Sequence, residues 1–422
     1  MDMKQGWEIK RLGDVCETGA GGTPLKTHKD YYEGGTIPWL LSGEVSQGEI
    51  FEAKNFITEK GLKNSSAKLF PPNTVLVAMY GATAGQVGIL RFEAATNQAV
   101  CGILPNDKII PEYLFYCFLE KKEELIAQAV GGAQPNISQI KIKNTKIPLP
   151  PLSEQQRIVS ILDEAFAAIA KAKANAERCL SLSKALFESY LQGVFEKKGE
   201  GWEEKTIGEI GNPKMCKRIF KEQTTTVGDI PFYKIGTFGK EPDAYISKEI
   251  YDEFRAKYSF PKKGDVLISA SGTIGRRVRY DGEPAYFQDS NIVWIENDEK
   301  QVSNDFLFEF YGACNWGSTK GATISRLYND NLKSIKISFP KSHKVQQTIV
   351  QQLNVLRAET QKLEAVYQKK IADLEELKKS ILQKAFAGEL PGGADTERSR
   401  SAEPKTEKSR RDDKIIEKMT TE

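Results

Sequence analysis

The chain has 422 residues, of which 40% are hydrophobic and 28% are charged. This composition excludes wholesale disorder, and the length allows two or three domains with ordinary cores. No apolar run reaches the roughly 18 residues of a membrane span, and the first residues lack the apolar core of a signal peptide, so we expect a cytoplasmic protein. A net charge of +3 does not by itself indicate a nucleic-acid binder, so any basic DNA-binding surface has to be local.

The second half of the chain repeats the first. The matched segments are 6–15 with 201–210, 37–39 with 230–232, 74–85 with 265–275, 146–150 with 336–340 and 155–159 with 346–350. Chance similarity is excluded because the pairs keep their order at an offset of roughly 190 to 195 residues. Solenoid repeats are only about 20–50 residues long. The period therefore indicates a duplicated domain pair, in which each globular part is followed by a segment that begins at a Gln-Gln motif.

The globular parts, residues 1–150 and 196–340, are predicted to mix α and β structure, so the expected fold class is α+β. Short runs rich in β-branched residues predict strands at 74–79, 86–90, 266–270 and 291–296. Glycine-bearing hairpin turns are expected to join these strands at 80–85 and 271–275. Short helices are predicted at 112–129 and 305–314.

A long helix is predicted at 151–195, directly after a Pro-Pro pair. Ser153 can cap this helix, with Gln156 at the reciprocal position of a capping box, and Gly193 offers a stop. Apolar and small residues at alternating spacings of four and three form a heptad seam. The seam residues are Ile158, Leu162, Ala165, Ile169, Ala172, Ala176, Cys179, Ser183, Leu186 and Tyr190.

A second long helix is predicted at 341–390, with Gly388 and Pro391 as stop signals. Its seam has the same register and consists of Ile349, Leu353, Leu356, Thr360, Leu363, Tyr367, Lys370, Leu374, Leu377 and Ile381. Small residues of the first seam match larger ones in the second, which favours one intramolecular coiled coil. Two alternatives stay open: each helix packs on its own globular part, or the helices mediate dimerisation.

The length of these helices suits a spacer. At 1.5 Å per residue, about 38 residues form a rod of roughly 55–60 Å. Adjacent major-groove faces of DNA recur about every 34 Å. Such a rod can therefore hold two DNA-binding modules at a fixed spacing, with unread base pairs between them.

The sequence contains no recognisable catalytic or metal-binding constellation. The turn at 81–85 lacks the Lys-Ser/Thr of a phosphate-binding loop, and no Asn/Asp-Pro-Pro-aromatic methyltransferase motif occurs. The two histidines, His28 and His343, lie in polar stretches and are too few for a metal site or a catalytic triad. Six cysteines contain no C-x-x-C pair, so neither disulfides nor structural zinc are expected. No catalytic or metal-binding residue is therefore predicted.

Several longer motifs occur in a fixed order around the duplicated halves. The first long helix begins with Pro-Leu-Pro-Pro-Leu-Ser-Glu-Gln-Gln-Arg-Ile-Val (148–159), and the second closes with Leu-Gln-Lys-Ala-Phe-Ala-Gly-Glu-Leu (382–390). Together with segments 37–40 and 78–85, these motifs resemble those of the specificity subunits of type I restriction–modification complexes. The resemblance covers nearly the whole chain, and the ordered repetition makes it specific although each motif is short.

This resemblance implies a DNA-binding subunit without catalysis of its own. Each globular part would be a target-recognition domain for one half of a bipartite, asymmetric site in double-stranded DNA. The long helices would form an antiparallel coiled coil that spaces the domains and docks two modification (methyltransferase) subunits. The modification subunits would bind S-adenosylmethionine and methylate adenine at N6. Restriction subunits, which act as motor and nuclease, would bind ATP and Mg. No cofactor is therefore expected on this chain.

Candidate DNA contacts occupy equivalent loops of the two halves. Asn and Gln can pair bidentately with adenine, whereas Arg and Lys contact guanine edges or phosphates. The candidates in the first half are Tyr80, Thr83, Asn97, Gln98, Gln134, Asn136, Lys141 and Lys143. Those in the second half are Thr273, Arg276, Arg277, Arg279, Gln288, Ser290, Lys320 and Arg326. Arg277 and Arg279 are predicted on one strand face, and the alternative for each amide is that it satisfies the backbone of a turn.

The remaining segments leave some functional alternatives open. Segment 17–30 has no clear counterpart in 211–229, as two different half-site specificities would require, although neutral drift explains it equally well. The charged stretch 391–422 is predicted to be a disordered tail. A coiled-coil scaffold that binds proteins, and a self-contained DNA enzyme, are the competing functions. The missing cofactor motifs argue against the enzyme, and retention of duplex DNA would argue against the scaffold.

Overall fold

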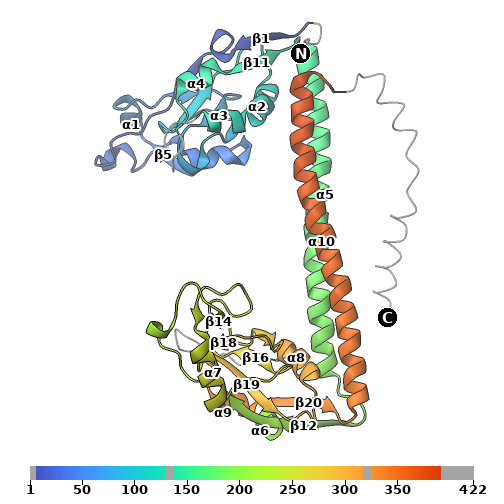
Figure 1. The fold of residues 1–422 in the computed structure, drawn as a ribbon. Coiled ribbons are helices and arrows are strands. Elements are labelled where there is room, and N and C mark those ends of the chain that lie inside the picture. Colours follow the sequence, from blue (N-terminus) through green and yellow to red (C-terminus); the bar gives the residue numbers. More distant parts are fainter. Residues whose placement is uncertain (1–5, 129–135, 315, 317–325, 391–422) are drawn as a thin grey trace, which may run out of the picture. The chain divides into compact units, whose positions relative to one another are not determined.

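The computed structural model describes residues 6–128, 136–314, 316 and 326–390 (Figure 1). The predicted tail and two candidate DNA contacts, Gln134 and Lys320, lie outside the described residues. The chain divides into two compact units: unit 1 is residues 1–174 with 372–422, and unit 2 is residues 175–371. Each unit therefore contains one globular part and a portion of both long helices.

The globular part of unit 1 contains two mixed sheets and a two-stranded ribbon. The five-stranded sheet has the order β2 (Thr18–Ala20), β10 (Val100–Ile103), β7 (Val75–Ala78), β8 (Val87–Leu90) and β4 (Glu49–Ile50). The four-stranded sheet has the order β5 (Asn55–Ile57), β3 (Ile37–Leu40), β9 (Ala94–Thr96) and β6 (Leu69–Phe70). β1 (Glu8–Arg11) pairs antiparallel with β11 (Lys146–Leu149), so the domain starts and ends at the same ribbon.

Strand β7 lies in the middle of unit 1 and is buried on both faces. Successive side chains of a strand point to opposite faces. Val75 and Val77 pack in the core beneath α2, whereas Leu76 and Ala78 pack in a second cluster with β3 and β4 residues. The helices are α1 (Glu59–Lys63), α2 (Pro111–Glu120), α3 (Lys122–Ala127) and α4 (Gln139–Asn144). Short 3-10 turns lie at Leu12–Asp14, Lys29–Tyr31, Ser42–Gln47 and Gly81–Thr83.

Unit 2 has the same plan of two sheets and a ribbon, but each sheet has one strand fewer. Its four-stranded sheet has the order β13 (Gly211–Lys214), β19 (Ile292–Asn297), β16 (Val266–Ser269) and β17 (Arg277–Arg279). Its three-stranded sheet is β15 (Tyr245–Ile246), β14 (Ile230–Tyr233) and β18 (Tyr286–Phe287), and its ribbon is β12 (Trp202–Thr206) with β20 (Lys336–Pro340). The helices are α6 (Ile207–Ile210), α7 (Lys248–Lys257), α8 (Asn304–Ala313) and α9 (Asn329–Ser334), and a 3-10 turn lies at Lys221–Gln223.

The predicted strands and hairpins are confirmed in both halves. β7 pairs antiparallel with β8, and β16 with β17, as hairpins across the two glycine turns. Gly81 and Gly272 have φ values of 67° and 66°, a conformation that favours glycine. The helix predicted at 112–129 is wrong as one element. It is two helices, α2 and α3, because Lys121 has ψ near 0° and interrupts the helical ladder.

The long helices are α5 (Leu152–Glu196) and α10 (His343–Ala387), of 45 residues each. In unit 1, Lys173 forms an ion pair with Glu375, and the Lys378 ammonium lies 4.9 Å from the centre of the Phe166 ring. In unit 2, the Arg357 guanidinium lies 5.0 Å from the centre of the Phe187 ring. From Phe166 to Lys173 along α5, the α10 partner changes from Lys378 to Glu375. The two helices therefore run antiparallel in unit 1, and Figure 1 shows the same direction within unit 2.

Both long helices also pack on a globular part. In unit 1, Leu162 of α5 and Leu382 of α10 lie in the same core cluster as α2. The Phe386 ring is 5.3 Å from that of Tyr113. In unit 1 the helices therefore pack both on each other and on the globular part. The predicted coiled coil and the alternative that each helix packs on a globular part are not exclusive.

Part of the predicted seam is wrong. The first seam is buried or half-buried up to Ser183, but Leu186 and Tyr190 are 39% and 42% exposed, and Phe187 and Leu191 face inward instead. On α10 the exposed seam predictions are Leu363, Lys370 and Leu377. An α-helix has 3.6 residues per turn, so a straight stretch drifts from a strict seven-residue repeat and the buried stripe shifts by one residue.

Of the residues predicted to start or stop the long helices, Gly388 is confirmed, whereas Ser153, Gln156 and Gly193 are not. Ser153 and Gln156 both lie inside α5, whose first turn bonds to the Pro151 carbonyl, so the expected capping box does not form. Gly193 does not stop α5, which continues to Glu196. Gly388 does end α10: its φ is 77°, and the following Glu389 N–H bonds back to the Lys384 carbonyl at 2.9 Å.

The first glutamine of each Gln-Gln motif explains why the motif is repeated. The Gln155 amide accepts from the Ile110 N–H at 2.9 Å and donates to the carbonyls of Lys108 and Pro150 at 3.1 and 2.9 Å. Gln346 makes the same three bonds in unit 2, to Ser303, Gln301 and Pro340. Both glutamines are fully buried. Each amide joins the start of a long helix to the loop before α2 or α8.

Three features of the described residues bear on the class of protein: membrane-spanning helices, metal-binding clusters and disulfides. None of the described helices is long and apolar enough to cross a membrane. Among these same residues, no group of three or more His, Cys, Asp or Glu side chains is placed to hold a metal ion. All six cysteines are unpaired.

Candidate DNA-recognition surfaces

Three segments meet at the end of β7 in unit 1. The Met79 N–H donates to the Ala99 carbonyl at 2.7 Å, and the Met79 carbonyl accepts from the Ile137 N–H at 2.8 Å. Tyr80 and Asn136 then form an isolated antiparallel bridge. The hairpin turn, the loop after β9 and the segment before α4 are therefore side by side, which brings together candidates from three separate stretches of sequence.

Some candidates in unit 1 hold their own turns. The Thr83 hydroxyl donates to the Tyr80 carbonyl at 3.1 Å, and the Asn97 side chain accepts from the Ala99 N–H at 3.2 Å. These groups stabilise loop geometry, as turn residues commonly do. Tyr80, which is 38% exposed, and the exposed Gln98 and Asn136 remain as the better-placed groups for base contacts.

A loop that the sequence did not single out also joins this surface. The Gly22 N–H donates to the Thr96 carbonyl at 2.8 Å, and the Thr23 hydroxyl donates to the Gln98 side chain. The Trp39 indole donates to the Gly22 carbonyl at 3.0 Å. A Cβ at Gly22 would lie 2.3 Å from backbone atoms of Ser66 and Ala67, so this close approach needs glycine. The Gly-Gly-Thr-Pro run was the available signal.

The two lysine candidates of unit 1 lie on α4. The Lys141 ammonium donates to the Gln128 carbonyl and is therefore engaged within the domain. The Lys143 side chain passes along Gly13, with its Cβ 3.4 Å from the position that a Cβ on Gly13 would occupy. The Lys141 cation is therefore held by the backbone, whereas Lys143 is exposed.

Unit 2 repeats the convergence at the end of β16. The Ala270 N–H donates to the Asn291 carbonyl at 2.7 Å, and its carbonyl accepts from the Leu327 N–H at 2.8 Å. Ser271 and Arg326 form the isolated bridge that corresponds to the one in unit 1. Arg326 also donates to the Ser290 carbonyl at 3.3 Å, and Ser290 has a φ of 52°.

The arginine cluster of unit 2 lies against α8. Arg277 and Arg279 do share a strand face, because both guanidiniums lie over the Phe308 ring of α8, at 4.6 and 4.8 Å. That face packs on the protein. Arg277 is mostly buried, burial lowers its pKa, and its guanidinium fills the space beside Gly312. Arg279 pairs with Asp305 at 2.9 Å. Direct DNA contact by Arg277 does not fit this position.

Arg276 and Gln288 hold a neighbouring loop. The Arg276 guanidinium donates to the Phe238 carbonyl at 2.9 Å, and the Gln288 side chain accepts from the Ile235 N–H at 2.9 Å. Loop 234–241 is thereby fixed next to the glycine turn, where Thr273 is exposed. Arg218 was also missed by sequence reasoning. Its side chain is 60% exposed and pairs with Asp289 at 2.8 Å, next to Ser290.

Comparison with known proteins agrees with this duplicated arrangement. A family model described as "Type I restriction modification DNA specificity domain" matches residues 4–177 and again 199–373. The chain belongs to this family of type I specificity subunits. The two matches each cover one globular part with the first portion of the following helix, as the internal repeat predicts.

Relatives and solved structures extend the likeness over most of the chain. A putative type I specificity subunit of Haemophilus influenzae is 50% identical over half of this chain, which covers 55% of that protein's length. The MjaIX specificity subunit of Methanocaldococcus jannaschii is 26% identical over 91% of this chain and 93% of its own.

Two solved structures share the fold. A chain from a study of type I restriction–modification complex assembly is 21% identical with a TM-score of 0.76, and 92% of this chain covers all of it. The HsdS subunit of Thermoanaerobacter tengcongensis is 20% identical with a TM-score of 0.60, and 92% of this chain covers 99% of it.

Proposed function

We propose that this specificity subunit recognises a bipartite, asymmetric sequence in double-stranded DNA, with one half-site contacted by each globular part. The observation that carries the proposal is the repeated meeting of three segments at the ends of β7 and β16. The framework is the same in both units, but the exposed side chains differ. Unit 1 presents Tyr80, Gln98 and Asn136 on this surface, whereas unit 2 presents Thr273, Arg218 and Arg326.

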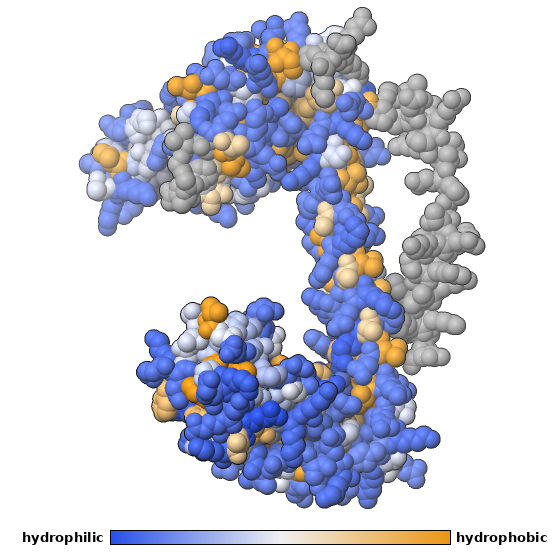
Figure 2. All heavy atoms as spheres, in the orientation of Figure 1, coloured by the Kyte–Doolittle hydropathy of each residue, from blue (hydrophilic) through white to orange (hydrophobic). Residues whose placement is uncertain are grey.

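The long helices support the second part of the proposal, docking of partner subunits. In unit 2, Leu182, Leu186 and Tyr190 form an exposed stripe on α5, spaced four residues apart. Val355, Leu363 and Val366 form a second exposed stripe on α10. Figure 2 shows hydrophobic residues along the long helices, whereas the faces of the globular parts seen there are mainly hydrophilic. We assign these stripes to two modification subunits.

The division of chemistry follows from this assignment. The modification subunits would bind S-adenosylmethionine and methylate adenine, and restriction subunits would use ATP and Mg for translocation and cleavage. A 45-residue helix is about 68 Å long, long enough for the pair to set a spacing between half-sites greater than one turn of DNA.

Genome-wide mapping of N6-methyladenine, in cells with and without this gene, tests the proposal. We expect loss of one bipartite motif with an unread spacer when the gene is deleted. Exchange of residues 1–150 for the domain of a relative should change one half of the motif only. Unchanged methylation in the presence of the partner methyltransferase would contradict the DNA-recognition role and favour a protein scaffold.

Arg326 and Arg277 allow a matched test of the recognition surface. Arg326→Ala should weaken binding of the assembled methyltransferase to its DNA site by about tenfold or more, because a guanidinium that contacts a base or phosphate contributes about 1–3 kcal/mol. Arg277→Met should leave that affinity nearly unchanged and lower thermal stability instead. Fluorescence anisotropy with a duplex carrying the mapped motif measures the first effect. Equal DNA affinities for the two variants would exclude Arg326 from the interface.

The α5 stripe can be tested by placing one charge in it. Leu186→Glu should weaken association with the modification subunit at least about tenfold, because a carboxylate would be buried without a partner. Ala185→Glu, one position along the same helix, is the control and should bind normally. Both sites are exposed, so unfolding transitions should not shift. Analytical ultracentrifugation of the mixed subunits measures the association, and equal binding of both variants would place the docking surface elsewhere.

A further inference from the structure

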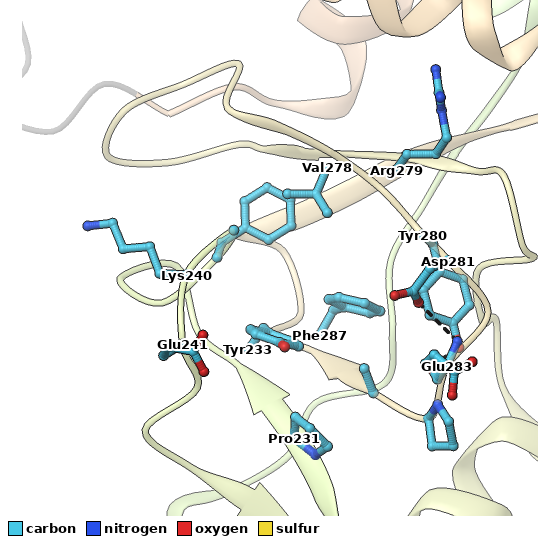
Figure 3. A pocket seen from close by; sticks show the side chains of 14 residues that line it. Pro231, Tyr233, Lys240, Glu241, Val278, Arg279, Tyr280, Asp281, Glu283 and Phe287 are labelled. Atoms are coloured by element: carbon cyan, nitrogen blue, oxygen red, sulfur yellow. Dashed lines mark hydrogen bonds between the residues drawn. The ribbon is translucent and has the colours of Figure 1, made fainter. Parts of the chain in front are cut away.

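A cavity of about 400 Å³ lies in unit 2 between loop 234–241 and the turn after β17. Tyr233 and Phe287 form its floor as a stacked pair, with ring centres 5.8 Å apart and planes inclined by 17° (Figure 3). Tyr280 meets Phe287 edge-on at 5.7 Å. Phe287 and Tyr280 are almost fully buried, whereas Tyr233 is half-exposed. The cavity therefore offers one accessible aromatic face on a rigid base.

The rim of this cavity is acidic. Its lining includes three carboxylates, Glu241, Asp281 and Glu283, and two basic side chains, Lys240 and Arg279. Arg279 is neutralised by Asp305 and lies over the Phe308 ring of α8. Figure 3 shows both Arg279 and Lys240 directed away from the Tyr233–Phe287 pair. The charge that faces the aromatic floor is therefore negative.

The turn that carries Asp281 and Glu283 is held by a hydrogen bond, and the acids influence Tyr233 electrostatically. Asp281 accepts from the Glu283 N–H at 2.9 Å, which fixes the turn that carries both acids. Burial raises the pKa of the Tyr233 hydroxyl, and the charges of Glu241 and Asp281 raise it further. Lys263 packs beside Gly282 of the same turn but does not line the cavity.

An aromatic face beneath carboxylates suits a cation and disfavours phosphate. A cation is attracted to the face of an aromatic ring, and a guanidinium adds planar stacking and paired hydrogen bonds to carboxylates. DNA would bring negative phosphates against three acids, which costs electrostatic energy. This cavity therefore differs in chemistry from the surface around Arg326 and Arg218.

We propose that this cavity binds an arginine side chain presented by a protein partner, with the guanidinium stacked on Tyr233 and paired with Asp281 or Glu241. It is thus a protein-docking site on the second recognition domain. The inference does not depend on the proposed DNA recognition by this chain.

Binding of a neutral and a charged peptide to the full chain tests the proposal. Acetyl-Gly-Arg-Gly-amide should bind several-fold more tightly than the isosteric citrulline peptide, because the neutral side chain loses both the ion pair with a carboxylate and the cation–π contact with Tyr233. Ligand-observed NMR titration measures both dissociation constants. Equal binding of the two peptides would overturn the proposal.

Variants separate the cavity from other acidic surface. Asp281→Asn and Glu241→Gln should each reduce binding of the arginine peptide several-fold, and Tyr233→Leu should reduce its preference over citrulline because the cation–π contact is lost. Glu296→Gln, which changes an exposed acid paired with Lys214 outside the cavity, should have no effect. Glu241 is exposed, so its variant keeps the test valid if Tyr233→Leu fails to fold. Unchanged peptide binding in both acid variants, or a loss of duplex DNA affinity in Tyr233→Leu, would contradict a protein-docking role.

Discussion

Replacement of Arg357 by methionine is expected to lower the free energy of unfolding of unit 2 by about 3–5 kcal/mol, the usual cost of breaking a buried ion pair from one side. Its partner Glu309, on α8, is 1% exposed and accepts a hydrogen bond from the Arg357 guanidinium. Without Arg357, this carboxylate stays buried, with the charge of Arg277 still near it. Removal of the cation therefore leaves a buried charge that has lost its guanidinium hydrogen-bond donor.

The measurement needs a probe that is local to unit 2. The chain contains two compact units, so a single global transition is not assured. Hydrogen exchange of α8 peptides, followed through urea unfolding, reports on the affected region. Lys362→Met on the same helix is the control. Its surface pair with Glu359 is exposed on both sides, so a change below about 0.5 kcal/mol is expected.

A double variant separates the ion pair from simple packing. Glu309→Leu combined with Arg357→Met removes both charges and should recover part of the lost stability, as apolar replacement of a buried pair often does. If the double variant is as unstable as Arg357→Met alone, the stacking of Arg357 on Phe187 is the larger contribution and the ion-pair account fails.

The sequence predicted those features that depend on local pattern and on the repeat. Strands β7 and β16 are short, mainly apolar and followed by glycine turns, so their type and their hairpin pairing followed from local pattern. The seam up to Ser183 followed from spacing in the same way. It failed at Leu186 and Leu363 because the number of residues per turn in a straight helix, rather than an ideal heptad, decides which side chain faces the partner.

Features that depend on long-range contacts were not predictable. Arg218 pairs with Asp289 across 71 positions, and the Gly22 loop is held by Thr96 and Trp39, so no local pattern in the sequence indicates these partners. The arginine cluster shows what burial adds. Arg277 and Arg279 were correctly placed on one strand face, but only the packing of α8 shows that Arg277 is mostly buried there while Arg279 stays exposed. Charge identifies candidate contacts, whereas burial decides which of them can reach DNA.

Gln346→Leu is expected to cost about 2–4 kcal/mol of stability in unit 2, although glutamine and leucine are similar in size. The change removes one acceptor and two donors, leaving the Ser303 N–H and the carbonyls of Gln301 and Pro340 without their buried partner. Each unsatisfied buried group costs about 1–3 kcal/mol, partly relieved by local rearrangement. Gln346→Glu should be at least as harmful, because a carboxylate would face two carbonyl oxygens.

The neighbouring glutamine supplies the control, and the repeat supplies a second test. Gln347 is exposed, so Gln347→Leu should change stability by less than about 0.5 kcal/mol. Gln155→Leu should produce the same loss of stability in unit 1. Hydrogen exchange should become faster at the loop before α2 and should not change at the loop before α8. If both buried variants were as stable as Gln347→Leu, the three-bond clamp would not be the reason that each long helix begins with Gln-Gln. If each variant destabilises only its own unit, the start of each long helix is anchored to its own globular part independently of the other unit. Exchange of one recognition domain could then leave the other intact.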